Sequence, residues 1–240
     1  MRAEQLITQL KKYSSTKRQK ANQWFFKTAP GQYGYGDKFL GVRVPDIRKV
    51  ARQFLDLDFP EIFKLIKSPI HEIRLVAILI LVEKNKAAIK NKNLALRKDI
   101  LNFYIKYRRQ INNWDLVDLS VHRILGQAIL DNLLGKKILY QYAKSQNLWE
   151  RRMSIIATAM FISQRKLDDC LKISKILLKD KEDLMHKAVG WMLREAWKKD
   201  SQRVENFLKK YYQVLPRTTL RYAIERIKEP KRKKILQGKF

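Results

Sequence analysis

The stretch Ile73-Arg74-Leu75-Val76-Ala77-Ile78-Leu79-Ile80-Leu81 indicates how this chain folds. Within it, Ile73, Ala77 and Ile80 are separated by steps of four and three residues, which place side chains on one face of a helix. Similar spacing continues through most of the sequence. No segment alternates polar and apolar residues as a half-buried strand does. The sequence therefore predicts an all-α fold.

Helix-start signals recur along the chain at a nearly regular interval. Ser68 directly precedes a proline, and a capping serine followed by proline at the first helical position marks the start of a helix. Asn112, Asn147 and Asp180 each have an acidic residue three positions later, as in a capping box, and Pro216 opens a further helix. The last four signals are roughly 35 residues apart, and the step before them is longer. A helical period of this length is typical of an α-solenoid, a superhelix in which one helix of each pair lines a shared concave face.

The one substantial loop near the N-terminus is rich in glycine. Four of the eight glycines in the chain fall within residues 31–41. The loop lacks the third glycine of the dinucleotide fingerprint, and no Gly-Lys-Ser/Thr follows it. We therefore expect a flexible connection that touches DNA, within a single domain that covers residues 1–240.

The charge of the chain is strongly positive. It has 52 Lys and Arg against 23 Asp and Glu, a formal net charge of +29. Such a field concentrates polyanions, so nucleic acid is the first partner to consider, with a solvated surface or an anionic membrane surface as alternatives. Binding to nucleic acid should weaken steeply with salt, because phosphate contacts release counterions.

Several other classes of protein are disfavoured. The single cysteine, Cys170, excludes an internal disulfide framework. No signal peptide is recognisable, and the longest apolar stretch, residues 75–82, is too short to span a bilayer. We therefore expect a cytoplasmic protein that is associated with the nucleoid rather than with a membrane.

No metal or cofactor is expected. The three histidines, His71, His122 and His186, are far apart in sequence and lack the spacing of paired metal ligands. A Gly-x-Ser-x-Gly elbow, which would indicate a serine hydrolase, is also missing.

Unusual residues occur on the predicted helix that follows Asn112. Trp114 and Asp118 are four residues apart and therefore share one helix face. Asp118 borders an apolar stripe, where a carboxylate needs a positive partner or a functional reason. The alternative to a catalytic role is a structural salt bridge to a basic residue of the next repeat.

Two later predicted helices carry comparable residues. Arg151 and Arg152 are suited to gripping a phosphate, although one of them is equally suited to pair with Asp118. Gly190 lies in mid-helix, where glycine costs about 1 kcal/mol relative to alanine. It therefore indicates close approach by a neighbour, beside Trp191.

These segments resemble the AlkD family of DNA alkylation-repair glycosylases. The resemblance runs from about Gln23 to Arg226 in unchanged order. The matching segments are Phe39-Leu40-Gly41-Val42-Arg43-Val44-Pro45, Asn113-Trp114-Asp115-Leu116-Val117-Asp118, Trp149-Glu150-Arg151-Arg152, Lys187-Ala188-Val189-Gly190-Trp191-Met192-Leu193-Arg194-Glu195 and Pro216-Arg217-Thr218-Thr219-Leu220-Arg221-Tyr222-Ala223. An aromatic position of the family's N-terminal helix maps near residues 24–26, where we assign no role.

The resemblance implies HEAT-like repeats whose concave face holds double-stranded DNA with alkylated bases. It also implies a monomeric, monofunctional glycosylase that releases cationic N3- and N7-alkylated purines. It places Trp114, Asp118 and Trp191 in the catalytic cleft and Arg152 on the DNA backbone. The further residues expected to contact DNA are Arg151, Lys187, Arg194, Arg217 and Arg221.

The implied chemistry suits a single carboxylate. A purine alkylated at N3 or N7 already carries positive charge, so it leaves without the general acid that ordinary glycosidases use. One ionised aspartate, Asp118, can stabilise the oxocarbenium-like sugar and direct a water. The alternative function is a non-catalytic HEAT-repeat protein that binds distorted or branched DNA, and a protein-binding solenoid is less compatible with the net charge.

Overall fold

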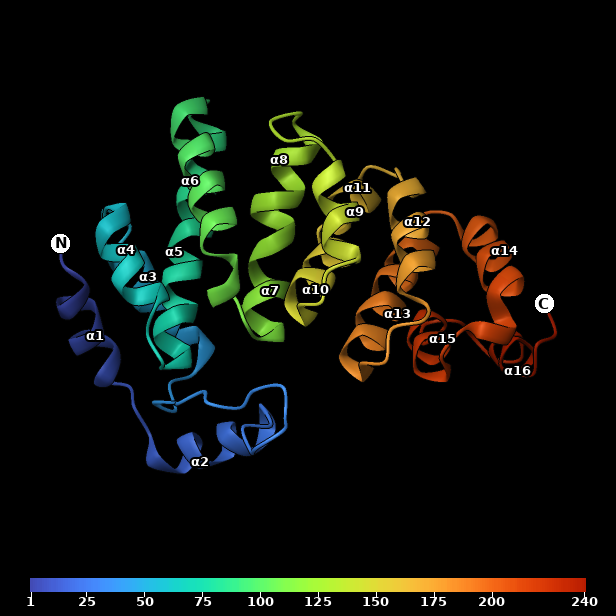
Figure 1. Ribbon diagram of the computed structural model, residues 1–240, viewed down its shortest axis with the longest axis horizontal. Coiled ribbons are helices and arrows are strands. Elements are labelled where there is room, and N and C mark those ends of the chain that lie inside the picture. Colours follow the sequence, from blue (N-terminus) through green and yellow to red (C-terminus); the bar gives the residue numbers. More distant parts are fainter. The chain divides into compact units, whose positions relative to one another are not determined.

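A computed structural model describes residues 1–240 as helices joined by turns and loops (Figure 1). The β structure is limited to an isolated parallel bridge between Lys38 and Ile70. The all-α fold predicted from the apolar spacing is therefore confirmed. The chain forms two compact units, Met1–Ser120 and Val121–Phe240.

The first unit is built around α5. Its elements are α1 (Ala3–Lys11), α2 (Thr16–Phe25), α3 (Val44–Gln53), α4 (Phe59–Ile66), α5 (His71–Lys90), α6 (Leu94–Lys106), the 3₁₀ turn Arg108–Gln110 and α7 (Trp114–Val121), the last residue of which belongs to the second unit. Every residue from His71 to Val82 is buried. A helix that is apolar on all sides must be enclosed, and α3, α4 and α6 pack against it.

The start of α5 lies later than the sequence indicates. Ser68 does not cap a helix that begins at the following proline, because the segment before α5 is held extended by a loop. The amide of Lys38 donates to the carbonyl of Pro69 at 3.1 Å, and the amide of His71 donates to the carbonyl of Lys38 at 2.8 Å. The hydroxyl of Ser68 accepts from the amide of Ile70 instead, and the helix begins at His71.

The second unit is a succession of short helices that contact their neighbours in the chain. Its elements are the π turn η2 (His122–Gly126), α8 (Gln127–Leu130), α9 (Lys137–Ala143), α10 (Leu148–Ile156), α11 (Ala159–Ser163), α12 (Asp168–Leu177), α13 (Asp183–Trp197), α14 (Ser201–Tyr211), the 3₁₀ turn Tyr212–Val214, α15 (Arg217–Ala223) and α16 (Lys231–Leu236). The helix α13 packs against α10, α12, α14 and α15.

Of the helix starts predicted in this unit, two are confirmed and one is wrong. Asn147 caps α10 as predicted, accepting hydrogen bonds from the amides of Trp149 and Glu150. Pro216 directly precedes α15, also as predicted. Asp180 does not cap α13, which begins at Asp183, because its carboxylate forms an ion pair with Arg151.

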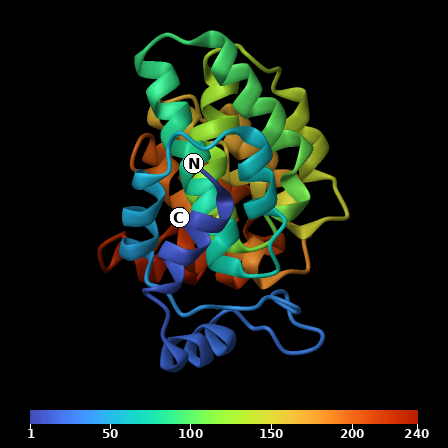
Figure 2. The same cartoon turned by 90° about the vertical axis from the view of Figure 1, so that its left-hand side faces the viewer.

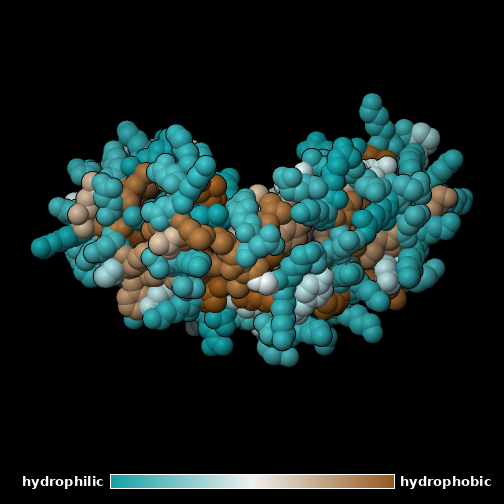
Figure 3. Space-filling model, turned by 90° about the horizontal axis from the view of Figure 1, so that it is seen from above, coloured by the Kyte–Doolittle hydropathy of each residue, from teal (hydrophilic) through white to brown (hydrophobic).

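Hydrophilic side chains cover much of the face shown in Figure 3, with hydrophobic residues visible between them. Cys170 is fully buried in α12, and its burial raises the pKa of the thiol to about 12. None of the helices combines the length and the apolar composition needed to cross a bilayer.

Candidate active site

The start of α7 differs by one residue from the prediction. Asn113, rather than Asn112, bonds to the first turn: its side-chain oxygen accepts from the amide of Trp114 at 2.8 Å, and its carbonyl accepts from the amide of Val117 at 3.2 Å. The side-chain oxygen of Asn112 is buried and accepts no hydrogen bond. The helix therefore begins at Trp114, with Asp118 one turn further along the same face.

The two carboxylates of α7 have different environments. Asp115 is 8% exposed, and its Oδ2 atom lies 2.8 Å from Nε2 of His71. Its Oδ1 atom accepts from the amide of Leu116 at 2.9 Å. Asp118 is partly exposed. Of the two acids of α7, Asp118 is therefore the less buried residue.

His71 joins α7 to the loop that precedes α3. Its Nδ1 atom lies 3.1 Å from Asp37, whose other carboxylate oxygen accepts from Arg74 at 2.6 Å. Asn113 also donates to Asp37, at 3.1 Å. Burial opposes the positive charge of His71, but the carboxylates of Asp115 and Asp37 outweigh it and raise its pKa to about 9.

The pKa of Asp37 is affected in the opposite direction. Burial opposes its ionisation, but the hydrogen bond from His71 and the charge of Arg74 outweigh the burial and lower the pKa. At neutral pH this network therefore contains the charged imidazolium of His71 and the charged carboxylate of Asp37.

Aromatic rings surround one face of Trp114. The ring of Phe26 stacks on it with centroids 5.5 Å apart, and the ring of Phe25 meets it edge-on at 5.9 Å. Phe26 also stacks on Phe39 at 5.1 Å and lies 4.7 Å from the ring of His71. Phe25 and Phe26, for which the sequence indicates no role, thus pack against the first residue of the candidate catalytic helix.

The buried carboxylate of Glu72 holds the end of the glycine-rich loop and the residue after it. Glu72 is 2% exposed and accepts hydrogen bonds from the amides of Leu40, Gly41 and Val42 at 2.9, 2.8 and 3.3 Å. Gly41 has a φ of +78°, and a Cβ atom there would overlap the carbonyl oxygen of Ser15 at the start of α2. This glycine therefore lets the loop cross closely over α2.

In the second unit, both arginines of α10 are bonded to protein atoms. Arg151 forms an ion pair with Asp180 at 2.6 Å and also donates to two backbone carbonyls. Arg152 is 5% exposed and donates to the carbonyl of Leu184 at 2.6 Å, just inside the start of α13. These contacts connect α10 to the following helix.

The helix α13 carries the remaining candidates of that region. Trp191 is partly exposed. Lys187 pairs with Asp183 at 2.7 Å, and the hydrogen bond from Lys187 lowers the pKa of Asp183. Arg194 pairs with Glu225. The close approach predicted at Gly190 is confirmed, because a Cβ atom there would lie 2.5 Å from Tyr222 on α15.

The two arginines of α15 are both exposed but make different contacts. Arg217 donates to the carbonyl of Leu236 at 3.0 Å and thus contacts the end of α16. Arg221 is exposed and lines an open pocket of about 620 Å³. The other residues of that pocket are Tyr222, Glu225, Arg232 and Leu236.

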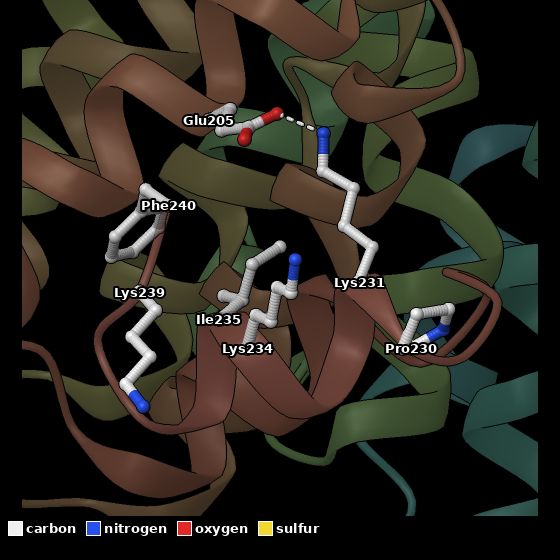
Figure 4. A pocket seen from close by; sticks show the side chains of 7 residues that line it. All are labelled: Glu205, Pro230, Lys231, Lys234, Ile235, Lys239 and Phe240. Atoms are coloured by element: carbon white, nitrogen blue, oxygen red, sulfur yellow. Dashed lines mark hydrogen bonds and ion pairs between the residues drawn. The ribbon is translucent and has the colours of Figure 1, made fainter.

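A second pocket of about 500 Å³ lies on α16 and the chain end (Figure 4). Lys231, Lys234 and Lys239 line it, with Lys231 paired to Glu205 on α14. The second unit therefore offers exposed cations on α15 and α16.

The structure brings some of the predicted site residues together within each unit. Trp114 and Asp118 share α7, and Lys187, Trp191 and Arg194 share α13. The sequence alone does not indicate the network of Asp37, His71 and Asp115, whose members are too far apart in sequence to form a motif. The one signal was the group of charged residues His71, Glu72 and Arg74 at the start of the longest apolar segment. No group of three or more His, Cys, Asp and Glu side chains is placed to hold a metal ion.

Comparison with known proteins agrees with this architecture. The family model described as "DNA alkylation repair enzyme" matches residues 6–227, which is nearly the whole chain. No protein with a curated description matches. A solved structure, "Predicted DNA alkylation repair enzyme from Enterococcus faecalis", superposes with a TM-score of 0.68 at 18% identity, covering 90% of this chain and 97% of that one. The chain belongs to the DNA alkylation repair enzyme family, as the resemblance predicts, and shares its all-α fold.

Proposed function

We propose that this protein is a monofunctional DNA glycosylase that hydrolyses the N-glycosidic bond of cationic N3- and N7-alkylated purines in double-stranded DNA. The observation that carries the proposal is the contrast between the two acids of α7. Asp115 is buried against His71, whereas Asp118 is partly exposed one turn after Trp114. A carboxylate held on a rigid helix beside an aromatic ring suits a reaction that develops positive charge.

Asp118 acts as an ionised carboxylate in this mechanism. The bond between C1′ of the sugar and the purine nitrogen breaks, and its electron pair leaves with the alkylated base, which becomes neutral. The negative charge of Asp118 stabilises the oxocarbenium-like sugar and orients a water molecule. The water oxygen bonds to C1′, and its proton passes to the carboxylate and then to solvent. No general acid and no lysine Schiff base are required, so strand cleavage is not expected.

The other candidates bind the substrate. Trp114 and Trp191 offer π-faces to the cationic nucleotide. Arg152, Arg217 and Arg221 are assigned to the phosphates; Arg217 and Arg221 are exposed, whereas Arg152 is buried. Arg151, Lys187 and Arg194, which form ion pairs with acidic residues of the protein, are assigned to DNA contacts as well. We further propose that the protein acts as a cytoplasmic monomer on the nucleoid.

The test is the dependence of base release on the charge of the lesion. The purified full chain should release 3-methyladenine and 7-methylguanine from methylated duplex DNA. It should not release neutral uracil, hypoxanthine or 8-oxoguanine, whose departure needs a proton donor. Release of the neutral bases would overturn the mechanism. DNA binding without release of any base would instead favour the non-catalytic alternative.

A further inference from the structure

The N-terminal arm, which we define as residues 16–38, combines exposed aromatic rings with positive charge. It consists of α2, the turn after it and the first part of the glycine-rich loop, and no residue of α2 is buried. Figures 1 and 2 both show this segment below the other helices of the first unit. Trp24 is 84% exposed, Tyr35 68% and Phe25 55%. Tryptophan is highly buried on average in folded proteins, so a ring left this far in solvent indicates a binding surface.

Packing and hydrogen bonds fix the part of the arm next to the other helices, although its exposed aromatic rings extend into solvent. Phe26 is 9% exposed and lies in the stack with Phe39 and Trp114. Gly34 donates its amide to the carbonyl of Lys27 at 3.1 Å, which brings Tyr35 to the end of α2 that carries Trp24. The backbone that carries the exposed rings is therefore fixed at both ends before any partner binds, so less backbone conformational entropy is lost on binding.

The charge of the arm identifies the chemistry of its partner. Its five cations are all exposed, whereas the side chain of its one acid, Asp37, is only 7% exposed and forms ion pairs with His71 and Arg74. The cations are Lys17, Arg18, Lys20, Lys27 and Lys38. Exposed aromatic rings among cations are the combination that binds nucleic-acid strands, with bases on the rings and phosphates on the cations.

We propose that the N-terminal arm is a second DNA contact, in which Trp24 stacks on an unpaired base while the lysines of the arm hold the adjacent phosphates. In an intact duplex both faces of each base are covered by its neighbours. A ring outside the helix can stack only on a base that has been displaced. The arm therefore favours duplexes with a displaced base over fully paired ones. This inference rests on the proposed function in one respect, namely that the partner of the protein is DNA.

The test compares two duplexes that are identical except for one unpaired adenine, with affinity of the full chain measured by fluorescence anisotropy. Wild type should bind the duplex with the unpaired adenine more tightly. Trp24→Ala should weaken that complex on the order of tenfold and leave the paired duplex nearly unchanged. Trp24→Phe, which keeps a ring, should retain most of the preference. Leu94→Ala is the matched control, since Leu94 is 47% exposed on α6 of the same unit.

Two results would overturn the stacking proposal: equal binding of both duplexes by wild type, or an equal effect of Trp24→Ala on both. Because Trp24 has little packing to lose, the thermal midpoint of the variant should match that of wild type.

The phosphate contacts have their own test. The double substitution Lys20→Ala with Lys27→Ala should reduce the slope of log Kd against log salt by about two. The control is Lys90→Ala with Lys98→Ala, an exposed pair at the end of α5 and on α6, and it should leave the slope unchanged. Equal slopes for the two double variants would overturn the arm as a contact. Base release by wild type tests the glycosylase separately, so loss of either proposal is recognisable by itself.

Discussion

The Nε2 atom of His71 lies 2.8 Å from Oδ2 of Asp115, and this ion pair joins the first turn of α5 to the first turn of α7. The other ring nitrogen of His71 contacts Asp37 of the N-terminal arm. One buried imidazolium thus holds both the helix that carries Asp118 and the segment that supports Trp114. Its charge state links the stability of this region to pH.

The first prediction concerns that linkage. The pKa of His71 is raised from 6.5 to about 9 in the folded protein, so the ion pair stabilises the fold fully below pH 6.5. The stabilisation is lost as the pH rises through 9, and it amounts to up to about 3 kcal/mol. Urea unfolding at pH 7 and pH 10 should show this loss in wild type and a smaller loss in His71→Gln. Identical pH dependence in the two proteins would contradict the assignment.

The second prediction separates the two acids of α7. Asp118→Asn should lower the rate of base release by at least about 100-fold while duplex affinity and thermal midpoint stay near wild type. Asp115→Asn should instead destabilise the fold on the order of 2 kcal/mol, because it removes a charge from the pair with His71. Single-turnover assays and thermal unfolding of both variants measure this difference. A folded, inactive Asp115→Asn protein with an active Asp118→Asn protein would reverse the roles.

The third prediction concerns the contact between α13 and α15. Gly190→Ala places a methyl group 2.7 Å from the carbonyl oxygen of Thr219, so the helices must separate. We expect a loss of about 1–3 kcal/mol in the free energy of unfolding. Gly135→Ala is the control, since nothing lies within 4 Å of a Cβ atom there. Equal stability of the two variants would show that the helices can yield at no cost.

The fourth prediction distinguishes exposed from ion-paired arginines. Arg221→Ala should lower the salt slope of DNA binding by about one without changing the thermal midpoint. Arg151→Ala should lower the thermal midpoint, because it leaves the buried carboxylate of Asp180 without its partner. Arg152→Ala should do both if the residue also reaches a phosphate. An unchanged slope for Arg152→Ala would limit that residue to its bond with the carbonyl of Leu184.

Local sequence signals predicted many of the helices because helical spacing of apolar residues reflects burial of one helix face, although α5 is buried on all sides from His71 to Val82. The cap at Asn147 and the close approach at Gly190 were also predictable, since each depends on its own position or on an adjacent helix. The helix starts at Ser68 and Asp180 were predicted wrongly because distant residues decide them. Lys38 keeps the chain extended before α5, and Arg151 binds Asp180 from 29 residues away.

The candidate site was predictable only in part. The step from Trp114 to Asp118 is local, and it placed both residues on one helix face. The partners of His71 lie 34 and 44 residues away on separate segments, so no spacing rule connects them. The identity of the buried acid of α7 likewise depends on the position of α5, which only the folded structure provides.

The burial of Cys170 has a consequence for a protein that belongs to an alkylation repair family. The electrophiles that methylate DNA also attack thiolates, which are the strongest nucleophiles among protein side chains. The one thiol of this chain is shielded from solvent and has a pKa of about 12, so it remains protonated at any physiological pH. The chemical exposure that creates damaged bases therefore meets no reactive thiolate in this protein.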